Sequence, residues 1–278
     1  MRRPARARPD EDGLLRAMVT SARVISANEP LLRAMLEEQV LQATSISMAL
    51  ARVLADRLAN SRLPAAALAT EIARLHEDVP ALGVHAAADI AAILERDPAS
   101  DDPCLVFLFH KGYMALQCHR AAHELWKSRR EALATVFQNR ASEVFGVDIH
   151  AAARIGRGAF IDHATGLVIG ETAVVGCNVT LFQGVTLGGT GKDIGDRHPK
   201  VDDDVTIYAG ATLLGNIRVG RGVRIGAGSV VLHDVAPNMT VAGAPARPVG
   251  ISSIVGGLRE RTPDQACAST SNLRETAR

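Results

Sequence analysis

The sequence is poor in aromatic residues and has no excess of either charge. Aromatic side chains make up 3% of the 278 residues, so a core of this size must be built from Ala, Val, Ile and Leu. The 31 Lys and Arg residues nearly balance the 30 Asp and Glu residues, for a formal net charge of +1. Proteins that bind nucleic acid normally carry a basic excess or stripe. The composition therefore argues against a nucleic-acid partner and favours small stacked units.

Long apolar runs and paired cysteines are also missing. No stretch is long and apolar enough to span a bilayer, and we expect no signal peptide and no membrane partner. The four cysteines form no CxxC pair and are too few for a disulfide framework: Cys104, Cys118, Cys177 and Cys267. These features predict a cytoplasmic protein with free thiols.

Residues 13–146 are predicted to form several helices separated by short turns. Their apolar residues roughly follow helical spacing within Ala-rich sequence. Breaks are expected near residues 28–30, 61–64 and 97–103, where Pro and polar residues gather. Residues 1–12, which are rich in Arg and Pro, are expected to form a disordered tail.

The clearest helix is expected over residues 124–145. Its apolar residues fall at intervals of seven, four and seven, which would place them in one stripe: Trp126, Leu133, Phe137 and Val144. Gly146 follows directly, and glycine commonly ends helices. The pattern predicts one helix that closes the first domain.

From Gly146 onward the period of the apolar residues changes to six. Three runs carry an aliphatic anchor at every sixth position: Ile149, Ile155 and Ile161; Ile169, Val175, Leu181 and Leu187; and Val201, Ile207, Leu213, Val219, Ile225 and Val231. Each hexapeptide would form one flat side of a prism, with its anchor pointing inward and small residues at the corners. Residues 147–250 are therefore predicted to form a parallel β-helix. The polar residues 251–278 are expected to be a flexible tail.

Two places break this count. From Ile161 to Ile169 the step is eight residues, so two are inserted. From Leu187 to Val201 the step is fourteen residues, so residues 188–200 are predicted to leave the prism as a loop. Loops held by a rigid scaffold commonly carry function.

Histidine and charged residues lie near both breaks. Asp148 comes fifteen residues before His163, close to one three-sided coil of about eighteen, so the two could be neighbours. A carboxylate beside a neutral imidazole suits general-base catalysis, because it fixes the tautomer and stabilises the imidazolium. The alternative is structural, since Asp and His also suit tight corners, and the pattern favours neither interpretation. His150 is expected to be an exposed corner residue, whereas Arg197 beside His198 offers a planar fork for a carboxylate.

Two other interpretations of these segments fail. Residues 188–192 superficially resemble a phosphate-binding loop, but Asp193 follows the lysine and the first glycine is missing. The histidines lack the paired short spacing of a zinc site, so no metal is predicted.

Taken together, the segments resemble the serine acetyltransferase family over roughly residues 20–250. In the repeat half the resemblance rests on residues 148–150, 156–158, 161–166, 170–173, 185–192 and 196–200. In the helical half it rests on residues 96–98 and on the stretch from Lys111 to Trp126. It implies an α+β fold: an N-terminal all-helical domain followed by a C-terminal left-handed parallel β-helix of hexapeptide repeats. It also implies transfer of acetyl from acetyl-CoA to the L-serine hydroxyl, which gives O-acetyl-L-serine and CoA in the first step of cysteine biosynthesis.

The resemblance assigns roles to individual residues. His163 matches the general base and Asp148 its orienting carboxylate. Four residues match the groups that hold the charged ends of serine: Asp97 and Asp162 for the ammonium, Arg197 and His198 for the carboxylate. Four more match positions beside CoA: Gly189, Ala209, Ala227 and Arg224. Tyr208 stands where family members usually have glycine, and it would either narrow the CoA groove or stack on the adenine.

The resemblance also implies an assembly. Family members form trimers through their prisms, with CoA between neighbouring subunits, and dimers of trimers through their helical domains. The chain ends in Arg278, without the terminal Ile that family members insert into O-acetylserine sulfhydrylase, which argues against that partnership.

Three alternatives stay open. A different acceptor is one, although Asp97, Asp162 and Arg197 argue against a neutral sugar. L-homoserine is harder to exclude, since one methylene is worth only about 1–3 kcal/mol of discrimination. The others are a non-catalytic β-helix scaffold and a zinc-dependent hydration of carbon dioxide.

Overall fold

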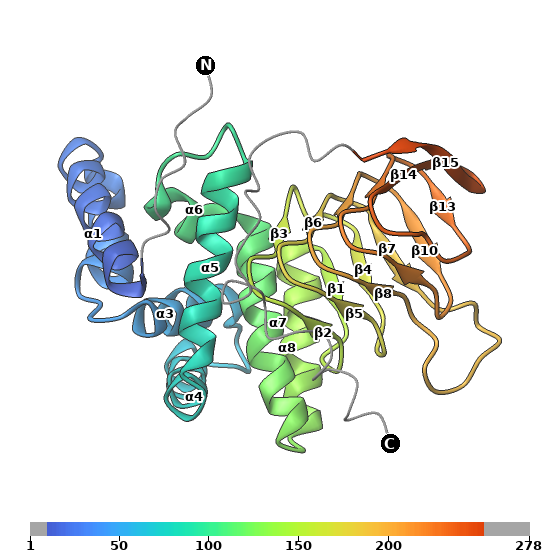
Figure 1. The fold of residues 1–278 in the computed structure, drawn as a ribbon. Coiled ribbons are helices and arrows are strands. Elements are labelled where there is room, and N and C mark those ends of the chain that lie inside the picture. Colours follow the sequence, from blue (N-terminus) through green and yellow to red (C-terminus); the bar gives the residue numbers. More distant parts are fainter. Residues whose placement is uncertain (1–9, 253–278) are drawn as a thin grey trace. The chain divides into compact units, whose positions relative to one another are not determined.

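The computed structural model describes residues 10–252, and the chain divides between Phe145 and Gly146 into a helical unit and a β-helical unit. The expected tails therefore lie almost entirely outside the described residues. The helical unit contains α1 Glu11–Asn28, α2 Arg33–Leu36, α3 Ile46–Leu58, α4 Ala65–Asp78, α5 Ala81–Arg96, α6 Pro103–Phe109, α7 Lys111–Lys127 and α8 Glu131–Phe145, with short 3-10 and π segments at Pro30–Leu32 and Glu37–Leu41 (Figure 1).

Local chemistry determines where several helices begin. The side chain of Asp10 accepts a hydrogen bond from the backbone N–H of Gly13, which caps α1. Asp102 caps α6 in the same way, accepting from Cys104 and Leu105. The expected breaks near residues 28–30, 61–64 and 97–103 are all present. Among residues 10–252, no helix combines the length and the apolar character needed to cross a membrane.

The prediction of one helix over residues 124–145 is wrong. α7 ends at Lys127 and α8 begins at Glu131, and Arg129 between them has a φ of 62°. The Ser128 hydroxyl donates to the carbonyls of Glu124 and Leu125, which offers the backbone an alternative to continuing the helix. α7 and α8 pack against each other, although Val144 of the expected stripe is exposed. Gly146, with a φ of 65°, does follow the last residue of α8.

The β-helical unit consists of short strands that stack into three sides of a prism (Figure 1). The strands are β1 Val147–Ile149, β2 Arg154–Ile155, β3 Phe160–Ile161, β4 Leu167–Ile169, β5 Val174–Val175, β6 Thr180–Leu181, β7 Thr186–Gly188, β8 Lys200–Val201, β9 Thr206–Ile207, β10 Thr212–Leu214, β11 Arg218–Val219, β12 Arg224–Ile225, β13 Val230–Val231, β14 Met239–Gly243 and β15 Ala246–Ile251. The first side is β1-β4-β7-β10-β13, the second β2-β5-β8-β11, and the third β3-β6-β9-β12-β14. All these pairings are parallel, and β15 pairs antiparallel with β14. The predicted hexapeptide β-helix is confirmed.

The hexapeptide anchors form the core of the prism. Every anchor except the half-buried Ile155 is at most 4% exposed. They stack in register, so that Ile149 pairs with Ile169, Ile169 with Leu187, and Leu187 with Leu213. Fully burying such a side chain stabilises a protein by about 1.5–3 kcal/mol. The anchor columns therefore hold the coils together.

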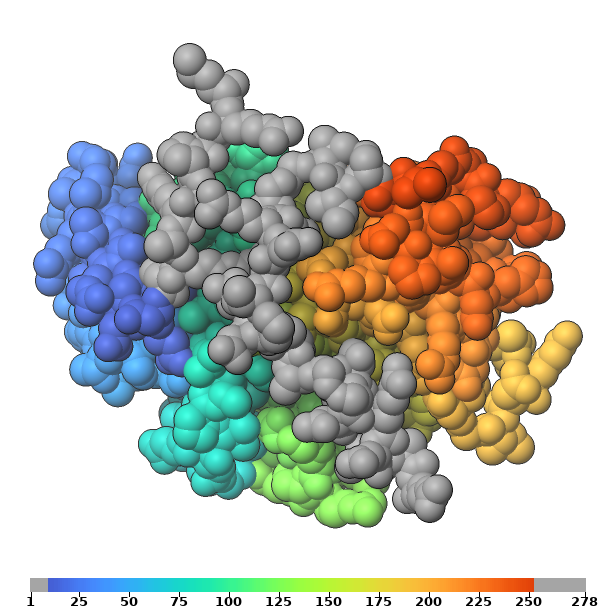
Figure 2. All heavy atoms as spheres, in the orientation of Figure 1, coloured from blue at the N-terminus to red at the C-terminus, as the bar shows by residue number. Residues whose placement is uncertain are grey.

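Both predicted interruptions of the repeat are present. Eighteen residues separate Ile169 from Leu187, whereas twenty separate Ile149 from Ile169 and twenty-six separate Leu187 from Leu213. The extra residues lie at the corner before β4 and in the loop over residues 188–200. Figure 2 shows this loop as yellow-orange spheres that stand out from the β-helical unit.

The cysteines correct one expectation. Cys104 and Cys118 are free and buried, and burial raises the pKa of each thiol to about 12. Cys177, however, is disulfide-bonded, so the prediction of free thiols is wrong for this residue.

Candidate active site

The predicted site residues of the β-helical unit gather at two corners of the prism. The entry corner leads into the first side and comprises residues 162–166, 182–185, 208–211 and 226–229. The exit corner leads out of the first side and comprises residues 170–173 and 189–199. Because β4 and β7 run from one corner to the other, the two groups lie at opposite ends of the same strands.

His163 and Asp162 lie at the entry corner, in a strained turn. His163 and Ala164 have φ values of 55° and 64°, and such left-handed conformations cost about 1–3 kcal/mol for residues other than glycine. The turn is held by the N–H of Thr165, which donates to the His163 carbonyl at 2.7 Å. The His163 side chain is 71% exposed, and its Nε2 lies 3.9 Å from Asp162 Oδ1, too far for a hydrogen bond. The turn thus presents an accessible imidazole beside a carboxylate.

Asp148 lies on β1, on the first side of the prism. The sheet register pairs it with Val168 on β4, because the first coil takes twenty residues rather than eighteen. The register therefore does not place Asp148 directly opposite His163, and the contact between them stays a prediction.

Arg197 and His198 are fastened to the exit corner by Glu171 and Thr172. Arg197 Nη2 donates to Glu171 Oε2 at 2.7 Å, and this hydrogen bond holds the pKa of the Glu171 carboxyl below its ordinary value. Arg197 Nη1 donates to the carbonyl of Gly195 at 3.0 Å. The backbone N–H groups of Arg197 and His198 donate to Thr172 Oγ1 at 3.0 and 3.1 Å. The base of the loop is therefore rigidly placed.

The His198 ring is buried against Gly170. A Cβ on Gly170 would lie 2.1 Å from the Cδ2 and Nε2 atoms of the ring, so only glycine leaves space for it. Burial, followed by the charges of Arg197 and Lys200, lowers the pKa of His198. The imidazole is accordingly held in its neutral form near neutral pH.

Ion pairs and hydrogen bonds hold the rest of the loop base. Lys200 Nζ donates to Asp196 Oδ1 and to the carbonyl of His198, both at 2.6 Å. Asn216 Nδ2 donates to Asp196 Oδ2 at 3.3 Å. The tip differs, since Ile194 is fully exposed. The loop thus combines a fixed base, which carries Arg197 and His198, with an exposed tip.

Three of the four predicted CoA residues lie together. Ala209 and Ala227 occupy neighbouring coils of the entry corner, where the N–H of Gly228 donates to the Ala209 carbonyl at 2.8 Å. Arg224 precedes this corner on β12. Gly189 is separate, because it lies at the exit corner, where a Cβ would meet Arg197 Cγ at 3.5 Å.

Tyr208 stacks on an aromatic residue of its own chain. Its ring lies over that of Phe182 on the neighbouring coil, with centroids 5.3 Å apart and an interplanar angle of 21°. Tyr208 nevertheless stays 37% exposed. One face of the ring is therefore covered by Phe182, next to the position of Ala209.

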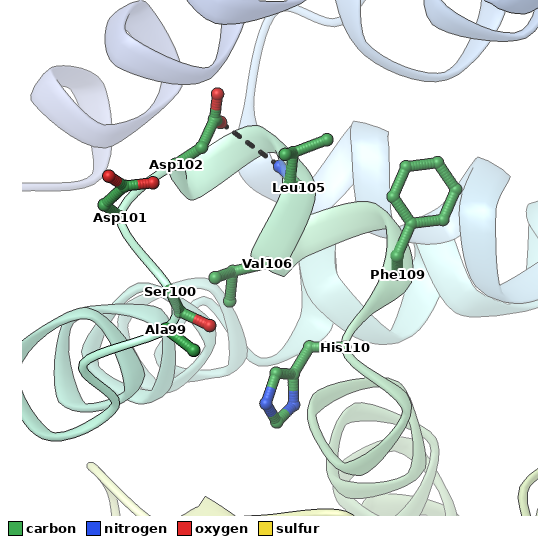
Figure 3. A pocket seen from close by; sticks show the side chains of 8 residues that line it. All are labelled: Ala99, Ser100, Asp101, Asp102, Leu105, Val106, Phe109 and His110. Atoms are coloured by element: carbon green, nitrogen blue, oxygen red, sulfur yellow. Dashed lines mark hydrogen bonds between the residues drawn. The ribbon is translucent and has the colours of Figure 1, made fainter.

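Asp97 belongs to the helical unit, directly after α5. Its carboxylate accepts hydrogen bonds from the backbone N–H of Ala99 at 2.8 Å and from the Ser100 hydroxyl at 2.7 Å. These two residues help to line a cavity of about 220 Å³. Figure 3 shows its lining: Ala99, Ser100, Asp101, Asp102, Leu105, Val106, Phe109 and His110. Asp97 therefore shapes one wall of a polar and apolar cavity. Across residues 10–252, no group of three or more His, Cys, Asp or Glu side chains is placed to hold a metal ion.

Comparison with known proteins identifies the family. Residues 14–118 match the family model "Serine acetyltransferase, N-terminal", and residues 198–233 match "Bacterial transferase hexapeptide (six repeats)". The serine acetyltransferase of Salmonella typhimurium is 49% identical over 82% of this chain and 84% of its own length. The chain belongs to the serine acetyltransferase family.

Solved structures of family members have the same fold. A Brucella abortus serine acetyltransferase in complex with coenzyme A gives a TM-score of 0.85 at 44% identity, covering 86% of this chain and 96% of that one. A Neisseria gonorrhoeae serine acetyltransferase in complex with serine gives a TM-score of 0.83 at 46% identity, covering 85% and 97%. The predicted membership of this acyltransferase family is confirmed.

Against this serine acetyltransferase background, the sequence analysis missed Glu171 and Thr172 and gave His150 only a structural role. The charge of His150 acts on the pKa values of both Glu171 and His198, so His150 lies near the exit corner. Their segments are among those that carry the family resemblance, but a polar residue after an anchor is ordinary in the repeats, so the sequence assigns these three residues no role of their own. Only the fold brings residues 170–173 against residues 197–198.

Proposed function

We propose that this chain transfers the acetyl group of acetyl-CoA to the hydroxyl of L-serine, giving O-acetyl-L-serine and CoA. The observation that supports the proposal is the exit corner, where Glu171 and Thr172 hold in place a guanidinium and an imidazole, two groups that suit a carboxylate. The complexes of family members with coenzyme A and with serine support the two substrates.

His163 acts as the general base. Its exposed imidazole takes the proton of the serine hydroxyl as the serine oxygen attacks the thioester carbonyl. The carbon–sulfur bond then breaks, and the CoA thiolate leaves and takes up the proton from the imidazolium. Asp148 orients the imidazole and stabilises its charged form. A positioned base of this kind contributes roughly 10²- to 10⁴-fold to the rate.

The two charged ends of serine are held by groups of opposite charge. Asp97 and Asp162 bind the ammonium, and Arg197 and His198 bind the carboxylate. The guanidinium has five N–H donors, and its contacts with Glu171 and Gly195 leave donors for a substrate carboxylate. This distribution of charge fits a zwitterionic amino acid better than a neutral sugar.

CoA lies along the small residues of the entry corner. Ala209 and Ala227 permit close approach of the cofactor, Arg224 meets a phosphate, and Gly189 lines the groove from the exit corner. Tyr208, stacked on Phe182, narrows this groove beside Ala209.

A complete site needs two copies of the chain. His163 and Asp162 lie at one end of β4, whereas Glu171 and Thr172, which hold Arg197 and His198, follow its other end. In a trimer of prisms, the entry corner of one copy would face the exit corner of its neighbour. Helical units would join two such trimers. A partnership with O-acetylserine sulfhydrylase is not part of this proposal.

Release of the CoA thiol from acetyl-CoA tests the function directly. Purified protein is compared with L-serine, L-homoserine and a galactoside as acceptor, beside the His163→Ala variant. We expect turnover with serine, reduced at least about a hundredfold in the variant. If only another acceptor were acetylated, the assignment of L-serine as substrate would be wrong. If a folded protein that binds acetyl-CoA acetylated no acceptor, the catalytic proposal would be wrong.

A further inference from the structure

The hydroxyl of Thr172 has all its hydrogen-bonding capacity in use at the exit corner. A threonine hydroxyl offers one donor and two acceptor lone pairs. Its oxygen accepts from the backbone N–H of Arg197 at 3.0 Å and from that of His198 at 3.1 Å. It also lies 2.9 Å from Nδ1 of the His198 ring. One side chain therefore contacts the backbone of both carboxylate-binding residues and the ring of one of them.

The geometry also identifies the tautomer of His198. The backbone N–H of Thr172 donates to His198 Nδ1 at 3.2 Å. Because an amide N–H can only donate, Nδ1 must accept and carries no proton in this arrangement. The Thr172 hydroxyl, whose lone pairs receive the two backbone N–H groups, lies within hydrogen-bond distance of this nitrogen and also bonds the Asp196 carboxylate, whose pKa it helps to lower. The single proton of the neutral ring consequently lies on Nε2.

The Nε2 atom packs directly against Gly170, where any side chain would displace it. A Cβ on Gly170 would come within 2.1 Å of Nε2, and glycine has none. The N–H at Nε2 is a donor, which is the group that a carboxylate requires. A ring with its proton on Nδ1 would instead face the substrate with a lone pair and repel it.

We propose that Thr172 is a positioning residue for the substrate carboxylate: it fixes His198 as the tautomer that donates from Nε2 and holds Arg197 beside it. This inference rests on the proposed function, because the acceptor of that hydrogen bond is the carboxylate of L-serine. Thr172 itself does not contact the substrate. Its effect is transmitted through the ring and backbone of the two residues that do.

Steady-state kinetics of Thr172→Val and Thr172→Ser test this role. Valine keeps the branched shape but has no hydroxyl, whereas serine keeps the hydroxyl without the methyl group. For Thr172→Val we expect KM for L-serine to rise about tenfold, with kcat within about twofold and KM for acetyl-CoA unchanged. Thr172→Ser should stay within about twofold of the wild type. A loss of kcat alone, or equal KM values for serine in both variants, would overturn the proposal.

A spectroscopic measurement on the unaltered protein separates this inference from the proposed function. Nitrogen NMR of protein labelled with ¹⁵N-histidine, with the His198 signals identified by their loss in His198→Asn, reports which ring nitrogen carries the proton. We expect an unprotonated Nδ1 and a protonated Nε2, both in the wild type and in Thr172→Val, which keeps the backbone N–H of residue 172. A proton on Nδ1 in the wild type would overturn the inference even if serine is acetylated. If His198 has the expected tautomer but serine is not acetylated, only the assignment of serine as the substrate is wrong.

Discussion

At the exit corner, the absence of a side chain at Gly170 determines where the His198 ring can lie. Its backbone lies against the His198 ring, and its φ is not in the left-handed region. An alanine is therefore compatible with the backbone conformation, and its nearest conflict is with the ring. Because the ring is the far part of a side chain, it can move away and leave the fold intact.

We accordingly expect Gly170→Ala to reproduce the loss of His198. KM for L-serine should rise about tenfold, because the ring is displaced from the position where it donates to the carboxylate. The double variant Gly170→Ala with His198→Ala should have the same KM for L-serine as His198→Ala alone, since both changes remove the same interaction. Steady-state kinetics of the three variants measure this.

The matched control is Gly250→Ala, where an added Cβ meets nothing within 4 Å. It should leave KM for serine unchanged. If the effects of Gly170→Ala and His198→Ala instead multiply in the double variant, Gly170 acts through something other than the His198 ring.

At this scale the sequence predicts residue types better than contacts. His163, Arg197 and His198 stand out because they lie at the two breaks in a regular repeat. Thr172 does not stand out, because its partners are twenty-five and twenty-six residues away and come close only through the long coil that holds the loop.

At the scale of the elements, the period of six was sufficient to predict the β-helix. In each hexapeptide one aliphatic side chain points into the prism, so the fold repeats directly in the sequence. The helix pair α7–α8 could not be predicted in the same way. Its turn contains no Gly or Pro, and apolar residues on both sides pack in the same interface. The antiparallel pair β14–β15 was also missed, because its residues have left the hexapeptide pattern.

His76 on α4 makes the helical unit sensitive to acid. Its Nδ1 lies 3.0 Å from the Ser47 hydroxyl on α3, and burial lowers its pKa from 6.5 to about 4. In the unfolded chain it takes up a proton near pH 6.5, while in the folded chain it stays neutral down to about pH 4. The stabilising contribution of neutral His76 is therefore complete above pH 6.5 and lost as the pH falls from 6.5 to 4, by about 3 kcal/mol.

The free energy of unfolding of the helical unit, measured by urea denaturation between pH 7 and pH 4, should therefore fall less steeply in His76→Gln than in the wild type. His233→Gln is the control, because His233 is exposed and lies in the β-helical unit. Identical pH dependence in His76→Gln and the wild type would show that His76 is not held neutral by burial.

At the scale of the whole molecule, the positions of the two corners determine whether one chain alone can form a complete active site. The strands of the first side separate the imidazole of His163 from Arg197 and His198, the proposed carboxylate receptor. The repeat and its interruptions predict each corner separately. The assembly that joins them does not follow from one chain, because surfaces that meet between copies leave no periodic pattern in the sequence.

The most direct test is activity in trimers mixed from two inactive variants. One chain carries His163→Ala, which removes the base at the entry corner, and the other carries Arg197→Ala with His198→Ala, which removes the receptor at the exit corner. The chains bear different affinity tags and are co-expressed at equal levels, and the tags establish that mixed trimers form. Acetylation of L-serine is then measured for the mixture and for each variant alone.

If neighbouring copies supply the two corners of each site, random mixing should restore roughly a quarter of the wild-type turnover, because three quarters of the trimers are mixed and each contains one intact site of three. Mixed trimers no more active than either variant alone would contradict this, and would place the base and the carboxylate receptor of each site in the same chain.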